Sequence, residues 1–491
     1  MKNPFIVIFI FLTCGTLSAQ PLTKYWVQFT NKAGSPYSID NPEVFLSPRA
    51  IERRKKYNIP IKTNDLPVNP KYIKKLQSLG CEIYTTSKWF NAATVYCPDK
   101  KTLKRLKALS FVKKTEAVGR YYKKNPKRTR PKVRDQKAKY YQEDKYFGFG
   151  RNQIEMLNGD ILHRMGYDGT GMLVAVLDGG FSNVDIMPFF DTLRATNRIL
   201  EGRDLVDNDD YVYESSSHGS HVLSTMAANL PGMLVGTAPG ATYVCIKTED
   251  VRSELRIEED NWVAGAEYAD SLGVDVINSS LGYTTFNIKS MSHEYKDLDG
   301  NTSRATIGAD IAASKGMLVV VSAGNEGNGR WKYVGAPADA DSVMAVGALD
   351  RDGDRVKFSS QGPTADGRVK PSVMARGGKS VVGSLYSYEV DSVDGTSFAS
   401  PIMAGMVTSL WQAFPNKTNM EIIRAIEKSA DRYDSPDKKH GHGTPDFYKA
   451  YRLLQGESQV KNKKKERPGI VKRNFVETMK IAKEKGKIIK P

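Results

Sequence analysis

Ser397 lies in a setting that would suit a catalytic nucleophile. It belongs to GTSFASP (395–401), and the small-residue apolar run IMAGMVTSLWQAF follows, which predicts a buried helix entered through a glycine turn. The N–H groups at a helix N-terminus are unpaired and carry partial positive charge, which favours an anion forming at the serine oxygen. A serine hydroxyl is a poor nucleophile until a base removes its proton. The chain must therefore also supply a base and an oxyanion donor.

Three other motifs supply these groups. MLVAVLDGG (172–180) predicts a buried parallel strand that carries Asp178 to its carboxyl edge. In SSSHGSHV, His218 lies where a loop becomes a helix, and MLVVVSAGNEG predicts a second buried strand whose edge presents Asn325. Carboxylate, imidazole, amide and hydroxyl groups at the ends of glycine-bounded elements are the parts of an acyl-transfer site at the carboxyl edge of an α/β sheet.

In the order Asp, His, Asn, Ser, these motifs resemble those of the subtilisin-type serine peptidases, the subtilases. The patterns NSSLG (278–282), FSSQGP (358–363) and VGAPADADSVMAVGA (334–348) extend the resemblance over roughly residues 146–455. One stretch departs from the family pattern: KPSVMARGG (370–378) stands where the family has Lys-Pro-Asp and then Ala-Pro-Gly, and we interpret it as a loop away from the catalytic motifs. The resemblance implies an α/β fold with a parallel central sheet flanked by helices, preceded by a small α+β propeptide domain.

The resemblance also implies the role of each site residue. Ser397 would attack the substrate carbonyl, His218 would act as general base, and Asp178 would orient the imidazole. Asn325 and the backbone N–H of Ser397 would hold the oxyanion. Of the two histidines in HGSH, the resemblance makes His218 catalytic and His221 structural.

Substrate binding is expected at three segments of small residues. The first resembles the family's edge strand, which pairs with the extended substrate backbone. All three would surround the first specificity pocket, and their small side chains leave room for a large apolar one. The residues are Ser280, Leu281, Gly282, Ser322, Ala323, Gly324, Gly335 and Ala336.

The 491 residues are too many for one ordinary domain. Residues 1–19 combine Lys2, an apolar run and small residues, which predicts a secretory signal cleaved near Ala19 and a periplasmic or extracellular location. A lipid anchor on Cys14 is the alternative.

Residues 20–122 alternate strand-like and helix-like pieces and predict a small α+β domain, with helices at 69–79 and 101–109. The resemblance makes this domain an inhibitory propeptide that assists folding, and a general binding module is the alternative.

The net charge of +17 suggests nucleic-acid binding until it is divided by segment. Residues 20–122 carry +13, 123–139 carry +8, 140–460 carry −14 and 461–491 carry +9. The acidic catalytic region argues against a nucleic-acid partner, and its charge opposes that of the N-terminal domain, which favours docking of the two.

The remaining segments complete the predicted domain organisation. Residues 123–145 contain two prolines and ten basic residues with few apolar ones, and predict a linker at which the propeptide is severed. The peptidase domain follows at 146–456, where RNQIEMLNGDILHRMG predicts a helix carrying a packing histidine, His163. The basic tail, 457–491, is predicted either to be disordered or to pack as an amphipathic helix on the acidic domain or an anionic surface.

Cysteines and candidate metal ligands leave alternatives open. Without the signal the cysteine count is odd, so no complete disulfide framework forms; Cys245 is expected in a buried strand, while Cys81 and Cys97 flank a predicted hairpin and could pair. His440 and His442 could bind a metal or belong to a loop. Two acidic stretches could bind calcium through hard oxygen ligands or be solvated loops. Their candidate ligands are Asp207, Asp209 and Asp210 in one stretch, and Asp297, Asp299 and Asn301 in the other.

These observations predict a secreted serine endopeptidase that is made as a zymogen. It would act as a monomer on proteins or peptides, require no cofactor, and bind no nucleic acid. No stretch after the signal reaches the ~18 apolar residues of a membrane span. A catalytically silent binding protein on the same scaffold is the alternative, and the presence of all four catalytic residue types argues against it.

Overall fold

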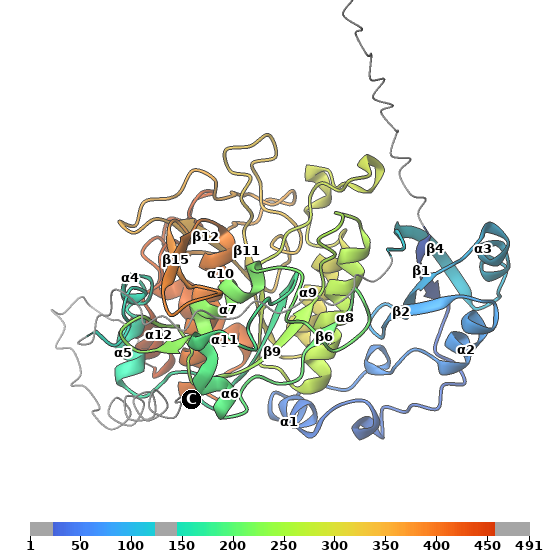
Figure 1. The fold of residues 1–491 in the computed structure, drawn as a ribbon, viewed down its shortest axis with the longest axis horizontal. Helices are drawn as coiled ribbons and strands as arrows, with labels where there is room; N and C mark the ends of the chain where they lie inside the picture. Colours follow the sequence, from blue (N-terminus) through green and yellow to red (C-terminus); the bar gives the residue numbers. More distant parts are fainter. Residues whose placement is uncertain (1–22, 123–144, 457–491) are drawn as a thin grey trace, which may run out of the picture.

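The computed structural model describes residues 23–122 and 145–456 (Figure 1). The predicted signal peptide, nearly all of the predicted linker and the basic tail lie outside the described residues. In the part of the chain that is described, no helix is long and apolar enough to cross a membrane.

The N-terminal unit is a small α+β domain, as predicted. Four antiparallel strands lie in the order β2-β3-β1-β4. Alternation along β1 divides its two faces: Val27 and Phe29 pack with Leu76 and Leu106 from the helices, while Trp26 faces the other way. The predicted helices are confirmed as α2 and α3. The elements are β1 (Lys24–Phe29), α1 (Pro48–Lys56), α2 (Pro70–Ser78), β2 (Glu82–Ser87), β3 (Ala92–Tyr96), α3 (Lys100–Lys107) and β4 (Val112–Gly119).

The second unit is built on a parallel sheet of seven strands in the order β13-β12-β11-β10-β5-β9-β6. Every neighbouring pair in this sheet runs parallel. The predicted fold class is therefore confirmed. The strands of this sheet are β5 (Leu173–Asp178), β6 (Arg203–Asp204), β9 (Thr242–Lys247), β10 (Val276–Ser279), β11 (Leu318–Ser322), β12 (Val343–Leu349) and β13 (Val373–Arg376). Two short antiparallel pairs lie outside it: β7 (Asn229–Leu230) with β8 (Leu234–Val235), and β14 (Ser380–Gly383) with β15 (Val390–Val393).

Helices cover both faces of this sheet (Figure 1). On β5, Val174 and Val176 join the core under α7 and α10, whereas Ala175 and Leu177 join the core under α8 and α9. Because both faces are covered, the strand is apolar at successive positions, as parallel strands require. The helices are α4 (Arg151–Glu155), α5 (Gly159–Arg164), α6 (Asp191–Ala195), α7 (His218–Ala227), α8 (Ile257–Leu272), α9 (Arg304–Ser314), α10 (Thr396–Ala413), α11 (Asn419–Ser429) and α12 (Phe447–Leu454).

Two local predictions were wrong. The single helix expected over residues 151–166 is divided into α4 and α5, because Asn158 adopts a left-handed conformation with φ 52° between them. The stretch 370–378 is not simply a loop, since its middle forms β13, the edge strand that pairs with β12. Four buried residues, VMAR, supply the apolar surface that this strand needs.

The N-terminal unit packs against α8 and α9 through the face of its sheet opposite to α2 and α3 (Figure 1). Trp26 and Trp89 belong to the same buried cluster as Trp262 of α8. Glu267 on α8 accepts hydrogen bonds from the Ser87 hydroxyl at 2.6 Å and from the Lys88 and Trp89 backbone N–H groups at 2.7 and 3.0 Å. The Glu267 carboxylate thus accepts three hydrogen bonds from the end of β2, and these fix the orientation of the N-terminal sheet on α8.

Buried ion pairs form the second part of this contact. Asp270 on α8 is fully buried and accepts from Arg53 at 2.6 Å, from Arg54 at 3.0 Å and from the Lys88 ammonium at 3.0 Å. Although burial opposes its ionisation, these cations lower the pKa of Asp270 to about 2. The contact therefore joins basic side chains of the N-terminal unit to acidic side chains of α8. This agrees with the opposite net charges of the two units in the sequence.

Candidate active site

Asp178 and His218 meet at the carboxyl edge of the parallel sheet. β5 ends at Asp178, whose side chain is 1% exposed, and α7 begins at His218. The Nδ1 atom of His218 lies 3.0 and 2.9 Å from the two carboxylate oxygens, and the Gly179 N–H donates to the same carboxylate at 2.7 Å. Because Nδ1 faces the carboxylate, it carries the proton, which leaves Nε2 as the acceptor in the neutral ring.

The environment of His218 favours its charged form. Burial lowers the pKa of His218, but the Asp178 charge and its hydrogen bond together outweigh burial and raise the pKa above the ordinary value. Among the described residues, His221, three positions further along α7, has no carboxylate within hydrogen-bond distance, and burial lowers its pKa. The structure therefore pairs His218, and not His221, with the Asp178 carboxylate, and the catalytic role of His218 stays a prediction.

Ser397 lies in the first turn of α10, which Gly395 enters with φ 151°. Pro401 within this helix has no N–H, so the Ser397 carbonyl loses its usual intrahelical donor. The Ser280 hydroxyl replaces that donor at 2.8 Å, and the Ser397 hydroxyl in turn donates to the Ser280 carbonyl at 3.2 Å. Two reciprocal hydrogen bonds thus fix the first turn of α10 to the end of β10.

The imidazole lies beside this same turn. The rings of His218 and Phe398, the residue after Ser397, have centroids 5.7 Å apart. Among the described residues the hydrogen-bond acceptor of the Ser397 hydroxyl is Ser280 and not His218.

Asn325 is held in an orientation that suits an oxyanion donor. Its side-chain oxygen accepts from the Thr396 N–H at 2.9 Å and from the Thr396 hydroxyl at 3.0 Å. With the oxygen so engaged, the NH₂ group of this exposed residue is left to donate elsewhere. The sequence missed Thr396 as the residue that orients this amide. The position of Thr396 directly before Ser397 was the feature of the sequence that could have indicated this role.

The expected substrate-binding segments converge on the same edge. Ser280 is buried, Leu281 is half-buried and Gly282 is exposed. A Cβ added at Gly282 would meet only the Ala336 carbonyl, at 4.0 Å, so this backbone lies open. A Cβ added at Gly324 would lie 4.0 Å from the Gly335 nitrogen, which brings the second and third segments together. Ser322 and Ala323, at the end of β11 and just after it, are buried.

A further residue that the sequence did not single out supports Ser280. The Asn278 amide donates to the Ser280 hydroxyl at 3.1 Å and accepts from the Ser400 hydroxyl at 2.8 Å. Asn278 therefore connects β10 to α10 through polar groups buried in the core. The feature of the sequence that could have indicated this role is the position of Asn278 at the start of NSSLG.

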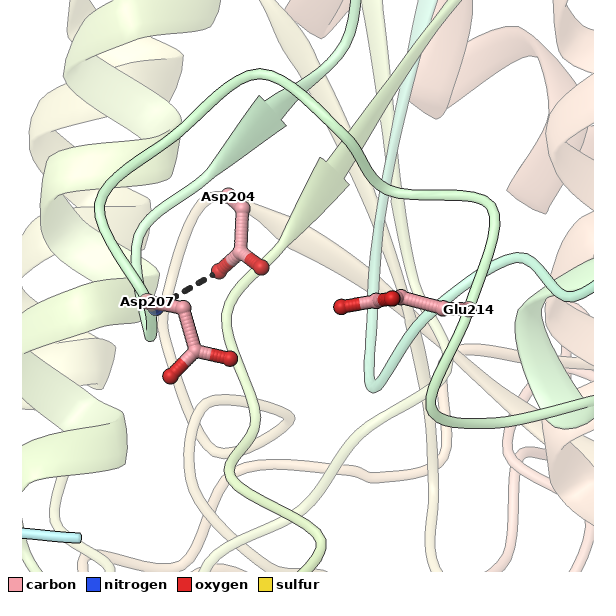
Figure 2. A group of neighbouring side chains, drawn as sticks. All are labelled: Asp204, Asp207 and Glu214. Carbon is pink, nitrogen blue, oxygen red and sulfur yellow. Dashed lines mark hydrogen bonds between the residues drawn. The ribbon is translucent and has the colours of Figure 1, made fainter. Parts of the chain in front are cut away.

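Of the first set of candidate calcium ligands, Asp207 belongs to a group of carboxylates, and Asp209 and Asp210 do not. Asp210 pairs with Arg203 at 2.9 Å, and the Asp209 side chain accepts from the Tyr211 N–H at 3.0 Å. The carboxylates that gather are instead Asp204, Asp207 and Glu214, with ligand atoms within 4.8 Å of one another and Glu214 directed toward the two aspartates (Figure 2).

This group of three carboxylates does not fit a calcium ion. The Lys247 ammonium already lies 2.9 Å from Asp204 and 3.5 Å from Asp207, and Arg252 lies 3.2 Å from Asp207. Asp204 also accepts from the Val206 and Asp207 N–H groups. Because two cations compensate the aspartates, the group is an ion-pair network.

The other candidate metal ligands take part in local structure. Asp297 accepts from the Glu294 N–H at 2.8 Å, and Asp299 accepts from the Asn301 N–H at 2.8 Å and the Thr302 hydroxyl at 3.1 Å. These contacts are those of a helix cap and a turn.

Two of the remaining histidines make local contacts, and the three cysteines are buried. His440 faces Asp437 at 2.9 Å, and His163 lies 3.0 Å from the Thr237 carbonyl, the packing role expected. Cys245 is buried in β9, as predicted. The Sγ atoms of Cys81 and Cys97 lie 3.6 Å apart as free thiols beside the β2–β3 hairpin, so their pairing stays a prediction.

Fold and site together define a subtilisin-like α/β protein. The family model described as "Subtilase family" matches residues 169–444, more than half of the chain. A second model, described as "Peptidase S8 propeptide domain, Bacteroidota", matches residues 24–136. The chain therefore belongs to the subtilase family and carries the propeptide domain of that family at its N-terminal side.

Curated relatives agree with this assignment. Subtilisin E of Bacillus subtilis (strain 168) is 33% identical over 282 residues, which are 56% of this chain and 65% of that protein. Subtilisin of Bacillus pumilus is also 33% identical over 282 residues, and the match covers 90% of it. The thermostable alkaline protease of Halalkalibacterium halodurans is 29% identical over 293 residues, 59% of this chain and 70% of that protein. The match thus spans slightly less than two thirds of subtilisin E.

Proposed function

We propose that this chain is a secreted serine endopeptidase made as a zymogen, with Asp178, His218 and Ser397 as its triad. The observation that carries the proposal is the contact of His218 Nδ1 with the Asp178 carboxylate, at 2.9 Å, beside the first turn of the helix that holds Ser397. The subtilase family and the propeptide domain support the reaction class and the zymogen form. The signal-like residues 1–19 support export.

The proposed reaction follows from the roles of these atoms. His218 Nε2 takes the proton of the Ser397 hydroxyl as its oxygen attacks the scissile carbonyl, and the resulting imidazolium is stabilised by Asp178. The developing oxyanion would accept from the Asn325 amide and the Ser397 N–H. Collapse of the tetrahedral intermediate breaks the C–N bond, and the imidazolium gives its proton to the leaving amine. Water, activated by the same imidazole, then releases the acyl group. No step of this chemistry needs a metal or a cofactor.

The N-terminal unit would hold the enzyme inactive until it is cut away. It buries α8 under Trp26 and Trp89 and neutralises Asp270 with three cations. Because the basic segment 123–145 connects the two units, cleavage there would separate them without breaking either fold.

The test is a comparison of the wild-type chain with Ser397→Ala. Wild-type enzyme should hydrolyse a chromogenic peptide and react with a labelled fluorophosphonate, and Ser397→Ala should do neither, because the nucleophile is gone. Autocatalytic maturation further predicts that Ser397→Ala stays at precursor size, and normal processing of that variant would mean that another peptidase makes the cut. A wild-type chain that neither reacts nor hydrolyses would favour the alternative, a silent binding protein on this scaffold.

A further inference from the structure

Cys81 and Cys97 lie opposite each other at the open end of the β2–β3 hairpin. Cys81 directly precedes β2 and Cys97 directly follows β3. The residues next to them, Glu82 and Tyr96, are paired across the two strands, so the next pair along the same ladder is Cys81 with Cys97. Residues 20–122 contain these two cysteines and no other. The fold therefore brings both cysteines of the N-terminal unit into one cross-strand pair.

The backbone around this pair is compatible with a bond between the two sulfur atoms, which lie 3.6 Å apart. The Cys81 N–H donates to the Leu76 carbonyl at 3.2 Å, and the Cys97 N–H donates to the Thr23 carbonyl at 2.9 Å. Because neither N–H donates to the opposite cysteine, the two form a non-hydrogen-bonded pair, in which Cα atoms are typically about 4.5 Å apart. That separation lies within the range of about 4.4–6.8 Å that disulfides span.

Both thiols are buried in the core of the propeptide domain, on the face of its sheet that carries α2 and α3. Cys81 is 4% exposed and Cys97 is 3% exposed, and both belong to the cluster that contains Val95 and Leu106. The domain packs against α8 through the opposite face of the sheet (Figure 1). A bond between the sulfurs would therefore hold the hairpin together without altering the residues that contact the second unit.

The chemistry of bond formation fits an exported chain. Residues 1–19 have the features of a secretory signal, and disulfides form and persist in oxidising compartments. The thiolate of one cysteine attacks a protein disulfide of the compartment, and the thiolate of the other attacks the resulting mixed disulfide. The two thiols lose two protons and two electrons, and the oxidant leaves as a dithiol. Because both sulfurs are buried in the folded domain, the exchange takes place before the core closes.

We propose that Cys81 and Cys97 form a disulfide bond in the exported chain, and that this bond stabilises the propeptide domain against unfolding. The bond joins residues 16 positions apart and so reduces the entropy of the unfolded domain. For a loop of this length, the equilibrium constant for unfolding should fall by roughly a hundredfold. The inference rests on the proposed export, because a reducing compartment would keep both thiols free. It does not depend on the peptidase reaction.

The first measurement is the state of the thiols in the full-length Ser397→Ala chain, purified after export. The chain is denatured without reductant, free thiols are blocked with a maleimide, and the peptides are mapped by mass spectrometry. Cys245 should carry the label, whereas Cys81 and Cys97 should be unlabelled and joined in one pair of linked peptides. Labelled Cys81 and Cys97 would overturn the inference.

The second measurement is the resistance of the propeptide domain to a trace of an added serine peptidase. The Ser397→Ala chain is made twice: once with export, and once without residues 1–19 in a reducing cytoplasm, where both thiols stay free. A peptidase cuts the transiently unfolded domain, so the rate of digestion follows the unfolding equilibrium. The domain of the reduced chain should be lost roughly tenfold to a hundredfold faster. Equal rates would overturn the stabilising effect of the bond.

Cysteine variants separate the bond from any other difference between the two preparations. The double variant Cys81→Ala/Cys97→Ala cannot form the bond and should be digested at the same rate in both. Cys245→Ala is the matched control, because Cys245 is a buried cysteine of the second unit, and the difference should remain. Each comparison is made between two preparations of one variant, so a less stable variant still gives an answer. A difference that persists in the double variant would contradict the inference.

These measurements do not use the peptidase activity of the chain, so they separate this inference from the proposed function. A joined pair in an exported wild-type chain that neither hydrolyses peptides nor reacts with fluorophosphonate would support the bond and overturn the peptidase function. A wild-type chain that hydrolyses peptides after export, with both thiols of its precursor free, would do the reverse.

Discussion

At the scale of single residues, the candidate site depends on hydrogen bonds from neighbouring side chains and N–H groups that hold its polar groups in place. Pro401 removes the donor to the Ser397 carbonyl, and the Ser280 hydroxyl supplies it at 2.8 Å. The Thr396 N–H and hydroxyl engage the oxygen of Asn325. The contact with Thr396 leaves the Asn325 NH₂ to donate elsewhere, and the Ser397 N–H points out of the first turn of α10. Because the supporting groups are buried, their geometry is set by packing before any substrate binds.

The amide of Asn325 can be tested by truncation. Asn325→Ala removes a donor that acts chiefly on the oxyanion of the transition state, so kcat should fall ~10²- to 10³-fold while KM changes little. Steady-state kinetics on one chromogenic peptide measure both. Glu326→Ala, the exposed neighbour, is the control and should retain full kcat. A large rise in KM with unchanged kcat would contradict the oxyanion role of Asn325.

The pH dependence tests His218. The neutral imidazole is the active form, and Asp178 raises the pKa of His218 above the ordinary value of about 6.5 against the opposing effect of burial. The rate should therefore be lost as pH falls through this raised pKa, with half of it gone above about pH 6.5. A profile of kcat/KM from pH 5 to 9 measures the midpoint. A flat profile, or a midpoint well below 6.5, would contradict the assignment of His218 as the general base.

At the scale of elements, α8 holds the N-terminal unit through its last two turns. These turns carry Glu267 and Asp270, which accept hydrogen bonds from Ser87 and Arg53 of that unit. Arg53 and Arg54 of α1 reach Asp270 from a segment outside the propeptide sheet, so α1 adds a second anchor to that sheet.

The anchor at Asp270 predicts weaker inhibition when its charge is removed. Asp270→Asn would leave the guanidinium of Arg53 and the ammonium of Lys88 buried without a carboxylate, which costs about 3–5 kcal/mol, or roughly 10²- to 10⁴-fold in the inhibition constant of the separated propeptide. Titration of processed enzyme with the separately made segment 20–122 measures this constant. Asp352→Asn, an exposed carboxylate remote from the contact, is the control. Equal inhibition of both variants would show that the ion pairs contribute nothing to docking.

At the scale of the whole molecule, opposite charge is divided between the two units. The N-terminal unit carries +13 and residues 140–460 carry −14, and the structure places their basic and acidic groups in contact. The apolar part of the same contact, around Trp26 and Trp89, does not depend on charge. Two components of docking should therefore respond differently to ionic strength.

Salt should slow the association of propeptide and enzyme without abolishing inhibition. Screening acts beyond a Debye length of ~10 Å at 0.1 M, so the long-range attraction weakens while the buried contact remains. Progress curves of peptide hydrolysis, with segment 20–122 added at low and high salt, give the association rate, and most of the change should lie there. The absence of inhibition at either salt concentration would remove the propeptide assignment. Inhibition at a salt-independent rate would keep it and reject the electrostatic argument.

Local sequence determined where the strands and helices that carry the candidate site residues end. The apolar run before Asp178, the glycine before the helix of Ser397 and the loop before His218 each specify where an element ends, because strand burial and helix termination are decided within a few residues. These ends place Asp178 and His218 at one sheet edge, where Nδ1 of His218 lies 2.9 Å from the carboxylate, and their catalytic roles stay a prediction. The same local logic failed at Asn158, where a left-handed residue divides a helix whose apolar periodicity continues across the break.

Only the tertiary structure decided which charged side chains form ion pairs with one another. Asp204 and Glu214 join Asp207 although the sequence pointed to Asp209 and Asp210, and Lys247 from a neighbouring strand pairs with Asp204 and Asp207. Arg53 reaches Asp270 across 217 positions of the chain. A charge contributes little to local conformation and much to packing, because its energy depends on burial and on partners brought together by the completed fold. Spacing along the chain therefore predicts the triad's positions but not its electrostatic surroundings.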